Sequence, residues 1–338
     1  MHSVRPYVAA AFLLGLSVVP AVAAPSPAAL TARAEHDRVA AYWTPARMAA
    51  AVPRDFVRTA DGFVPRARPG GGGVTGASWA DGGEISKTEG KVYFHMDGGD
   101  WQCSGTAAED NRTGMSVVLT AAHCAYDETN GDGQLSGFAT NWIFIPAWDL
   151  KPGTFSSACD AGATQYGCWR ATGLVVDTGF ATAGGFNDQA TRHDFAFAIV
   201  GGGGFSGTQT LAQAGVVEFA VSVSSVTAGV EVYAFGFPAA GKYHGNDLTY
   251  CRGNTITDQY NNDDTFGIPC NMTGGSSGGG WLRPFTTGTG VGTLGGLNSY
   301  GYSGIKNMYG PDFNADTTNI YNAAKSRTIG NELVPANP

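Results

Sequence analysis

The stretch from Asn271 to Trp281 reads NMTGGSSGGGW and sets two serines between two runs of glycine. A flexible Gly/Ser linker is one interpretation, because such a composition forms coil. The stretch is short, however, and apolar residues flank it. If Ser276 or Ser277 is instead a nucleophile, the glycines shape its loop. The rest of the chain must then supply a base, an orienting acid and an enclosing fold.

Histidine is scarce, so the search for a base is short. The six histidines are His2, His36, His95, His123, His193 and His244. His123 follows the apolar run SVVLTAA and precedes Cys124, so a disulfide at that cysteine would fix the turn that carries the imidazole. A histidine packed at the end of a strand is the alternative interpretation.

An aspartate directly precedes another apolar run. Asp194 lies in HDFAFAIV, residues 193–200, where apolar side chains fall on both faces of the predicted strand. A carboxylate buried there costs free energy unless it is hydrogen-bonded, and an imidazole N–H is a suitable donor. An aspartate that only caps the strand is the alternative.

The chain order His123, Asp194, Ser277 separates families of folds. α/β-Hydrolases place an acid and then a histidine after the serine, whereas no histidine follows Ser277. Asp177, His244 and Ser277 give the subtilisin order, but the few dozen residues between that histidine and the serine leave little room for the intervening sheet. The DTG that Asp177 opens has no second copy, as an aspartic protease requires, so we interpret it as a strand and a turn.

Short β-branched and aromatic runs predict a mostly-β fold. They are KVYFHM, SVVLTAA, NWIFIPAW, GLVVDT, FAFAIV, GVVEFAVSV and VEVYAFGF, between residues 91 and 237. EDNRTG before MSVVLT predicts the tip of a hairpin. Fifty glycines and a charged fraction of 14% fit tight turns and short strands, which favour a sandwich or barrel over a βαβ fold. TTNIYNAAKS predicts a short C-terminal helix, with Thr317 or Thr318 near its cap.

The N-terminal region differs in composition from the rest. Residues 1–23 combine a basic start, an apolar run and small residues before a cleavage site after Ala23, which predicts an export signal and hence a secreted protein. We expect residues 24–85 to be a propeptide and linker, with helical pieces interrupted at Pro45 and Pro53 and a glycine loop, RPGGGG. The folded domain is then 86–338.

The net charge and the cysteine content exclude some classes of partner and cofactor. A net charge of -8 without any run of Lys or Arg argues against nucleic acid and anionic membranes, and no apolar run is long enough to cross a bilayer. Six cysteines in an exported chain favour disulfides over metal ligands, so we expect no metal and no other cofactor. They fall into three local couples, although other pairings are possible: Cys103 with Cys124, Cys159 with Cys168, and Cys251 with Cys270.

Four segments together resemble the chymotrypsin-like, or trypsin-like, serine proteases. They are CSGT at 103–106, LTAAHC at 119–124, HDFAFAIV at 193–200 and GGSSGGG at 274–280. The likeness extends from about residue 90 to 302 and is greatest to the bacterial branch that contains the glutamyl endopeptidases. AYWTPARM is similar to the propeptides of such enzymes. The resemblance implies two antiparallel six-stranded β-barrels, about 86–205 and 206–325, and a monomeric, cofactor-free endopeptidase acting on proteins or peptides.

The same resemblance assigns roles to individual residues. His123 would be the general base, Asp194 its orienter and Ser277 the nucleophile, with the N–H groups of Gly275 and Ser277 as the oxyanion hole. Only Ser277 meets the family pattern G-x-S-G-G. Animal enzymes carry an aspartate before the nucleophile, and it pairs with the new N-terminal amine after zymogen cleavage. Ser276 cannot form that pair, and we expect it to turn inward.

The resemblance also locates the substrate-binding residues. A trypsin-like preference needs a carboxylate six residues before the nucleophile, where this chain has Asn271 followed by Met272. A glutamate preference goes with a histidine at the position of Asn298. We therefore expect a neutral P1 residue. The strand edge that pairs with the substrate backbone would be Ser299, Tyr300 and Gly301.

Two other functions fit the same residues: a non-catalytic binding module on the protease scaffold, and a serine esterase. An intact triad with its glycines argues against the binding module, because such a module has no physical need to keep them. Hydrolysis of protein substrates separates an endopeptidase from an esterase.

The segment DETNGDGQL, residues 127–135, partly matches a calcium loop. Glu128, Asn130 and Asp132 alternate before Gly133, but Ala139 stands where the closing glutamate is needed. A solvated hairpin is therefore the favoured interpretation.

Overall fold

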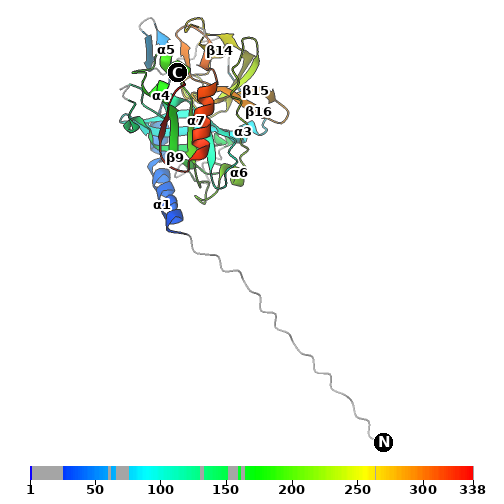
Figure 1. The fold of residues 1–338 in the computed structure, drawn as a ribbon. Helices are drawn as coiled ribbons and strands as arrows, with labels where there is room; N and C mark the ends of the chain where they lie inside the picture. Colours follow the sequence, from blue (N-terminus) through cyan, green and yellow to red (C-terminus); the bar gives the residue numbers. More distant parts are fainter. Residues whose placement is uncertain are drawn as a thin grey trace.

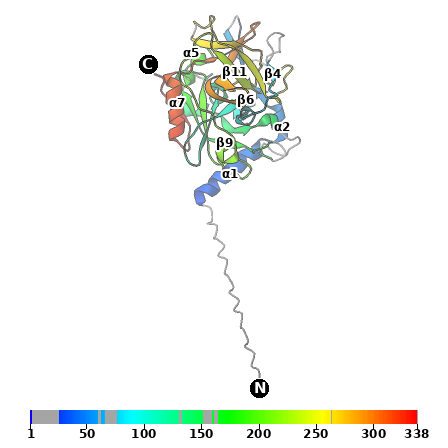
Figure 2. The same ribbon diagram turned by 90° about the vertical axis from the view of Figure 1, so that its right-hand side faces the viewer.

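The computed structural model describes residues 1, 26–59, 62–65, 76–129, 133–150, 159–160, 164–262 and 264–337, without the side chains of 63–65, 135 and 150. Except for Met1, the predicted signal peptide lies outside these ranges, as do the loop RPGGGG, Asn130 and Asp132. More of the described chain is in short strands than in helices, with α1 (Pro27–Tyr42) at one end of the body and α7 (Ala315–Ser326) along its side (Figures 1 and 2).

The first half of the domain is a closed six-stranded antiparallel barrel. Its strands lie in the order β6-β5-β8-β9-β10-β7, and pairing of β6 with β7 closes the ring. EDNRTG connects these two strands, as the hairpin prediction requires. The strands are β5 (Glu89–Met96), β6 (Gly99–Ala108), β7 (Ser116–Thr120), β8 (Thr140–Pro146), β9 (Trp169–Asp177) and β10 (Ala196–Val200).

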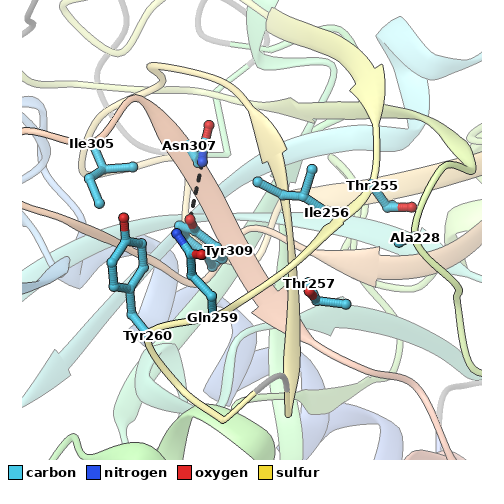
Figure 3. Close-up of a pocket in the computed structure, with 9 residues that line it drawn as sticks. All are labelled: Ala228, Thr255, Ile256, Thr257, Gln259, Tyr260, Ile305, Asn307 and Tyr309. Carbon is cyan, nitrogen blue, oxygen red and sulfur yellow. Dashed lines mark hydrogen bonds between the residues drawn. The ribbon is translucent and has the colours of Figure 1, made fainter.

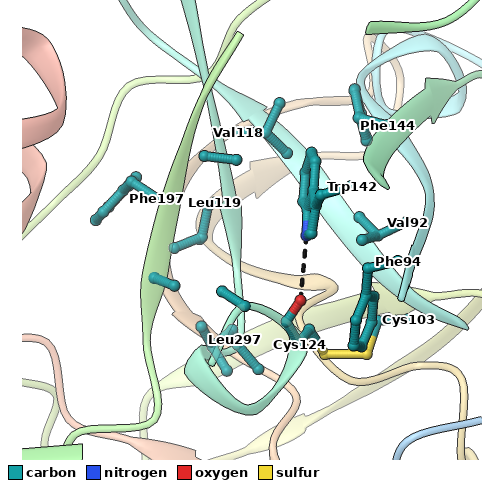
Figure 4. Packing of buried hydrophobic residues seen from close by; sticks show 14 of the residues in the cluster. Val92, Phe94, Cys103, Val118, Leu119, Cys124, Trp142, Phe144, Phe197 and Leu297 are labelled. Atoms are coloured by element: carbon teal, nitrogen blue, oxygen red, sulfur yellow. Dashed lines mark hydrogen bonds between the residues drawn. A yellow bond between two sulfur atoms is a disulfide. The ribbon is translucent and has the colours of Figure 1, made fainter. Parts of the chain in front are cut away.

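The core of this barrel holds the turn that carries His123. Apolar side chains from facing strands fill the interior, among them Phe94 and Phe144 (Figure 4). Phe197 points outward and packs against Tyr321 of the C-terminal helix. Burial of each such ring contributes roughly 1.5 to 3 kcal/mol. The Trp142 indole N–H donates to the carbonyl of Cys124 at 3.1 Å. The disulfide of that cysteine to β6 then fixes the turn from a second side.

The second half contains two sheets rather than one regularly paired ring. One has the order β16-β15-β11-β12-β4 and the other β13-β14-β18-β17-β2-β3. Their strands are β4 (Ala77–Ser78), β11 (Glu231–Gly236), β12 (Thr249–Asn254), β13 (Ile256–Thr257), β14 (Thr265–Pro269), β15 (Gly280–Thr286), β16 (Val291–Leu297), β17 (Tyr300–Tyr302) and β18 (Asn307–Pro311). The disulfide Cys251–Cys270 ties β12 to the end of β14. The chymotrypsin-like architecture expected from the sequence is confirmed.

The predicted C-terminal helix is present as α7 (Ala315–Ser326) and packs beside β9 and β10 (Figure 1). Its N-cap is Asn314, while Thr317 completes a capping box. Strand β19 (Glu332–Val334) then pairs with β9. The remaining short helices are α3 (Ile85–Thr88), α4 (Thr178–Ala181), α5 (Asp188–Arg192) and α6 (Leu211–Ala214), with 3-10 turns η1 (Ala122–Cys124), η2 (Leu135–Gly137) and η3 (Trp148–Leu150).

The N-terminal segment is packed onto the barrels. It forms α1 (Pro27–Tyr42), α2 (Pro45–Ala50), β1 (Val52–Pro53), β2 (Phe56–Thr59) and β3 (Gly62–Pro65). Pro45 begins α2, where its missing N–H costs nothing. Trp43 is fully buried, and its indole N–H donates to the carbonyl of Asn141 at 2.6 Å. This segment is therefore part of the folded body.

One predicted strand is wrong. GVVEFAVSV, residues 215–223, contains no regular strand and makes only isolated bridges, from Phe219 to Ala108 and from Val221 to Leu294. The run connects the two halves, and only Val216 and Phe219 among its apolar side chains are buried, without a continuous neighbouring strand. In the described part of the chain, none of the helices has both the length and the apolar character needed to traverse a bilayer.

Candidate active site

His123 and Asp194 form a buried pair. His123 lies in η1, directly after β7, and Asp194 lies two residues before β10, the strand that pairs with β7. The Nδ1 atom of His123 is 2.8 Å from one carboxylate oxygen, and its backbone N–H donates to the other at 2.8 Å. Neither side chain is exposed to solvent. The carboxylate thus fixes both the imidazole and the turn that carries it.

Ser299 supplies a third donor to this carboxylate. Its hydroxyl donates to Asp194 Oδ2, and its backbone N–H donates to Tyr309 O at 2.9 Å. Ser299 therefore links the acid on the first barrel to β18 of the second half. The sequence placed this residue only on the substrate-binding edge.

Ser277 lies in a tight glycine turn before β15. Gly275 has a φ of +98°, which favours glycine. A Cβ on Gly278 would clash with the carbonyl of Ser104 and with Ala121 N. The Ser276 hydroxyl donates to Thr273 O at 2.8 Å, so it turns inward. In the described part of the chain, the N–H groups of Gly275 and Ser277 make no hydrogen bond with the protein.

The hydroxyl of Ser277 and the imidazole of His123 each contact another group. Ser277 Oγ donates to Ser299 O at 3.4 Å. His123 Nε2 lies 3.2 Å from the carbonyl oxygen of Arg54, which belongs to the N-terminal segment. The free nitrogen of the imidazole is thus covered by the chain's own backbone.

The N-terminal segment crosses the site between the two halves. On one side, β1 pairs in parallel with β6, with Val52 opposite Trp101. On the other, β2 pairs in parallel with β17, with Phe56 opposite Tyr300. The Phe56 ring stacks on Phe186 at 4.0 Å between centroids. The strand edge that the sequence analysis assigned to substrate is thus paired with β2 in this structure, from Tyr300 to Tyr302.

The side chain of Arg54 fills a buried acidic pocket beside His123. Its guanidinium donates to Glu128 Oε2 at 3.1 Å and to Tyr126 O at 3.2 Å, and it also donates to the carbonyl of His123. Burial raises the pKa of the Glu128 carboxyl, while the guanidinium opposes this shift. Glu128 is not on a solvated hairpin as expected, because Arg54 supplies it with a buried partner from far away in the sequence.

The other predicted specificity residues are hydrogen-bonded or buried within the protein. Asn271 Oδ1 accepts from Gly76 N at 2.7 Å and from the Tyr243 hydroxyl at 2.6 Å, and Met272 is fully buried. The Asn298 amide donates to Phe235 O at 2.6 Å and to Ser276 O at 3.1 Å, and its oxygen accepts from the Trp281 indole at 2.8 Å. The side chain of Asn298 thus braces the serine loop from behind.

The subtilisin-order alternative from the sequence analysis relied on Asp177 and His244, which lie in different surroundings from each other. Asp177 is buried at the end of β9, where it caps α4, and burial raises its pKa to about 7. Its Oδ1 atom is 3.3 Å from His193 Nδ1, whereas His244 is exposed. Asp177 therefore ends a strand, as predicted, and it is followed by the short helix α4 in place of the predicted turn.

A surface pocket lies elsewhere on the second half (Figure 3). Its lining comes from residues 255–260 and 305–309 together with Ala228, and Asn307 donates to the Tyr309 hydroxyl at 3.1 Å. No residue of the His123, Asp194 and Ser277 group lines it. His123, Asp194 and Ser277 are buried instead, and the N-terminal segment contacts His123 through Arg54 O.

Three disulfides are present, and they join the couples considered from the sequence: Cys103–Cys124, Cys159–Cys168 and Cys251–Cys270. Two of them brace the site directly. The first holds the turn of His123, and the third joins the two sheets of the second half next to Asn271.

Comparison with solved structures finds serine proteases. A thermostable serine protease from an extremophilic microorganism is 32% identical, with a TM-score of 0.58, over 72% of this chain and 99% of that one. The protease Anisep from Arthrobacter nicotinovorans is also 32% identical, with a TM-score of 0.57, over 71% of this chain and 96% of that one. A Glu endopeptidase shares the fold at 18% identity and a TM-score of 0.52, over 77% and 99%. No protein-family model and no curated protein matches the sequence.

Proposed function

The chain belongs to the chymotrypsin-like serine proteases, related to the branch that contains the glutamyl endopeptidases, and from this premise we propose that it is a serine endopeptidase using His123, Asp194 and Ser277. The observation that carries the proposal is the buried carboxylate of Asp194, which binds both Nδ1 and the backbone N–H of His123. This arrangement leaves Nε2 as the proton-accepting atom of the imidazole.

The proposed reaction uses these residues in turn. Ser277 Oγ attacks the carbonyl carbon of the scissile bond and passes its proton to His123 Nε2. The N–H groups of Gly275 and Ser277 donate to the oxyanion of the tetrahedral intermediate. Collapse breaks the C–N bond, and the imidazolium protonates the departing amine. A water molecule, deprotonated by the same imidazole, then hydrolyses the acyl-enzyme and releases Ser277.

The same roles fix the direction of a bound substrate. The acyl half stays with Ser277, whose hydroxyl adjoins Ser299 just before β17. The leaving amine must reach His123, whose turn is tied to β6 by the disulfide of Cys103. A substrate therefore runs from β17 towards β6, and we propose that its P1 side chain is neutral, because Asn271 and Met272 carry no charge.

The N-terminal segment runs the opposite way, from β6 to β17. A backbone that is reversed in the cleft occupies the edge strands without presenting a peptide bond to Ser277 in the productive orientation. We propose that residues 24–85 are a propeptide that blocks the site until it is removed. The protein would be exported by the signal peptide 1–23 as an inactive precursor, and three disulfides fit an oxidising compartment.

Fluorophosphonate labelling of the processed protein tests the proposal. We expect a single adduct, mapped by peptide mass to Ser277, and its loss in Ser277→Ala and His123→Ala. Ser276→Ala is the matched control and should still be labelled, because that hydroxyl donates to Thr273 O. A folded, processed chain without an adduct would refute the proposal in favour of a binding module. Labelling with hydrolysis of esters but not of proteins would replace it with an esterase.

A further inference from the structure

The pocket that holds Arg54 is a built cation site. The arginine side chain is 8% exposed, and its guanidinium faces the carboxylates of Glu128 at 3.1 Å and Asp127 at 3.7 Å. Two backbone carbonyls, of His123 and Tyr126, accept hydrogen bonds from the Nη1 atom of Arg54. Two acids and two carbonyls around one guanidinium match the donor geometry of arginine and also suit an ammonium group.

All of these acceptors belong to the protease domain. The carbonyls lie on the turn that the disulfide Cys103–Cys124 fixes. The carboxylate of Asp127 accepts from Thr129 N at 3.1 Å and from the Thr129 hydroxyl at 2.8 Å, and Asp127 N donates to Gly137 O at 2.8 Å. The pocket therefore does not depend on the N-terminal segment for its shape.

Removal of that segment leaves the pocket without its cation. The Glu128 side chain is 1% exposed, and its Oε1 atom has no hydrogen-bond partner in the described part of the chain. Once the segment is removed, water replaces Arg54 around the two carboxylates, and a basic side chain that enters the pocket can form the same charge-assisted hydrogen bonds. After processing, the negative charge of the two carboxylates attracts another basic side chain to the pocket.

The pocket lies on the leaving-group side of the scissile bond. The backbone N–H of Arg54 donates to Gln102 O on β6 at 3.3 Å, and the Arg54 carbonyl lies against His123 Nε2. β6 is the strand towards which the amine half of a substrate runs. The backbone of the first or second substrate residue after the scissile bond therefore takes the position of the Arg54 backbone. Its side chain can enter the same pocket.

We propose that Glu128 and Asp127 form a specificity subsite for lysine or arginine at the first or second residue after the scissile bond, and that Arg54 occupies it in the precursor. The inference rests on the proposed function, because it concerns the substrate of the same site. It adds a charged preference to a protease whose P1 residue is neutral.

The test uses the processed enzyme and internally quenched peptides that differ only at those two positions. At one of them, arginine and lysine should raise kcat/KM at least about tenfold over alanine, because a charge-assisted hydrogen bond of this kind contributes on that order, and glutamate should lower it. Glu128→Gln should reduce the preference to within about threefold, and Asp127→Asn should reduce it partly. Glu218→Gln, a partly buried acid that contacts Ser116, is the control and should leave it unchanged.

A p-nitroanilide substrate, which has no residue after the scissile bond, separates the possible failures. Each variant should hydrolyse it, which shows that the variant is folded, and the control Glu218→Gln should do so at the wild-type rate. Hydrolysis of this substrate with equal rates for arginine, alanine and glutamate peptides would overturn the subsite. A preference that survives in Glu128→Gln would overturn its assignment to this pocket. No hydrolysis of any substrate would instead overturn the proposed function.

Discussion

Replacing Arg54 by alanine in the unprocessed chain is expected to open the active site. The guanidinium is a buried partner of Glu128 and of two carbonyls. Removing one partner of a buried ion pair costs roughly 3 to 5 kcal/mol, since the other charge stays buried and unpaired. In the open state Glu128 is reached by water, so this cost falls on the closed state. The open fraction should rise roughly a hundred- to several-thousand-fold, because about 1.4 kcal/mol is a factor of ten.

The assay is the rate of fluorophosphonate labelling of Ser277 in chain that still carries residues 26–59, as checked by mass. The rate in the precursor reports the open fraction, and the rate in processed enzyme is its upper limit. Arg47→Ala is the matched control in the same segment. Its ion pair to Asp100 is on the surface, where the arginine is 47% exposed, so the change should be less than about fivefold.

Two results would refute this reasoning. If wild-type precursor is labelled as fast as processed enzyme, the segment does not block Ser277 at all. If wild type is slow and Arg54→Ala is equally slow, the pairing of β1 and β2 and the stacking of Phe56 hold the segment, and the buried ion pair does not.

Three further changes probe the framework of the site. Asp194→Asn should lower kcat by about 10⁴, because an amide stabilises the wrong imidazole tautomer, and wild-type turnover in a folded variant would contradict the triad. Removing the disulfide with Cys251→Ser and Cys270→Ser should cost about 3 kcal/mol in urea unfolding, and an unchanged midpoint would contradict its bracing role. Burial raises the pKa of Glu89 from 4.5 to about 8. Wild-type stability should therefore fall as pH rises from 4.5 through about 8, and a Glu89→Gln variant with the same slope would refute this.

The parts of the site that rest on local patterns were predictable from the sequence. HDFAFAIV has apolar residues at every position after the aspartate, so a strand buried on both faces follows directly, and β10 is fully buried. The glycines around Ser277 indicated a turn with unusual backbone angles, and the φ of Gly275 agrees. Short turn-punctuated strands indicated the β architecture. Each of these inferences needs only residues that are neighbours in the chain.

The parts that rest on distant contacts were not predictable. Nothing near Glu128 in the sequence shows that it is buried, because its partner Arg54 is 74 residues earlier. The acidic, turn-rich composition around it favoured a solvated hairpin instead. The resemblance assigned Asn298 to substrate binding, yet its amide is hydrogen-bonded to Phe235, Ser276 and Trp281. Only the fold brings these groups together.

The geometry around His123 and Ser277 is consistent with the proposal that removal of the N-terminal segment is sufficient for activation. The pair of His123 and Asp194 is already formed, and the N–H groups of Gly275 and Ser277 are already free to donate. Animal enzymes have a charge-pairing aspartate at the position of Ser276. In this chain the Ser276 hydroxyl donates a hydrogen bond to Thr273 O at 2.8 Å. No new ion pair is then needed to order the loop. Under the roles proposed above, a segment that lies in reverse against His123 can block the site while the pair of His123 and Asp194 is already formed.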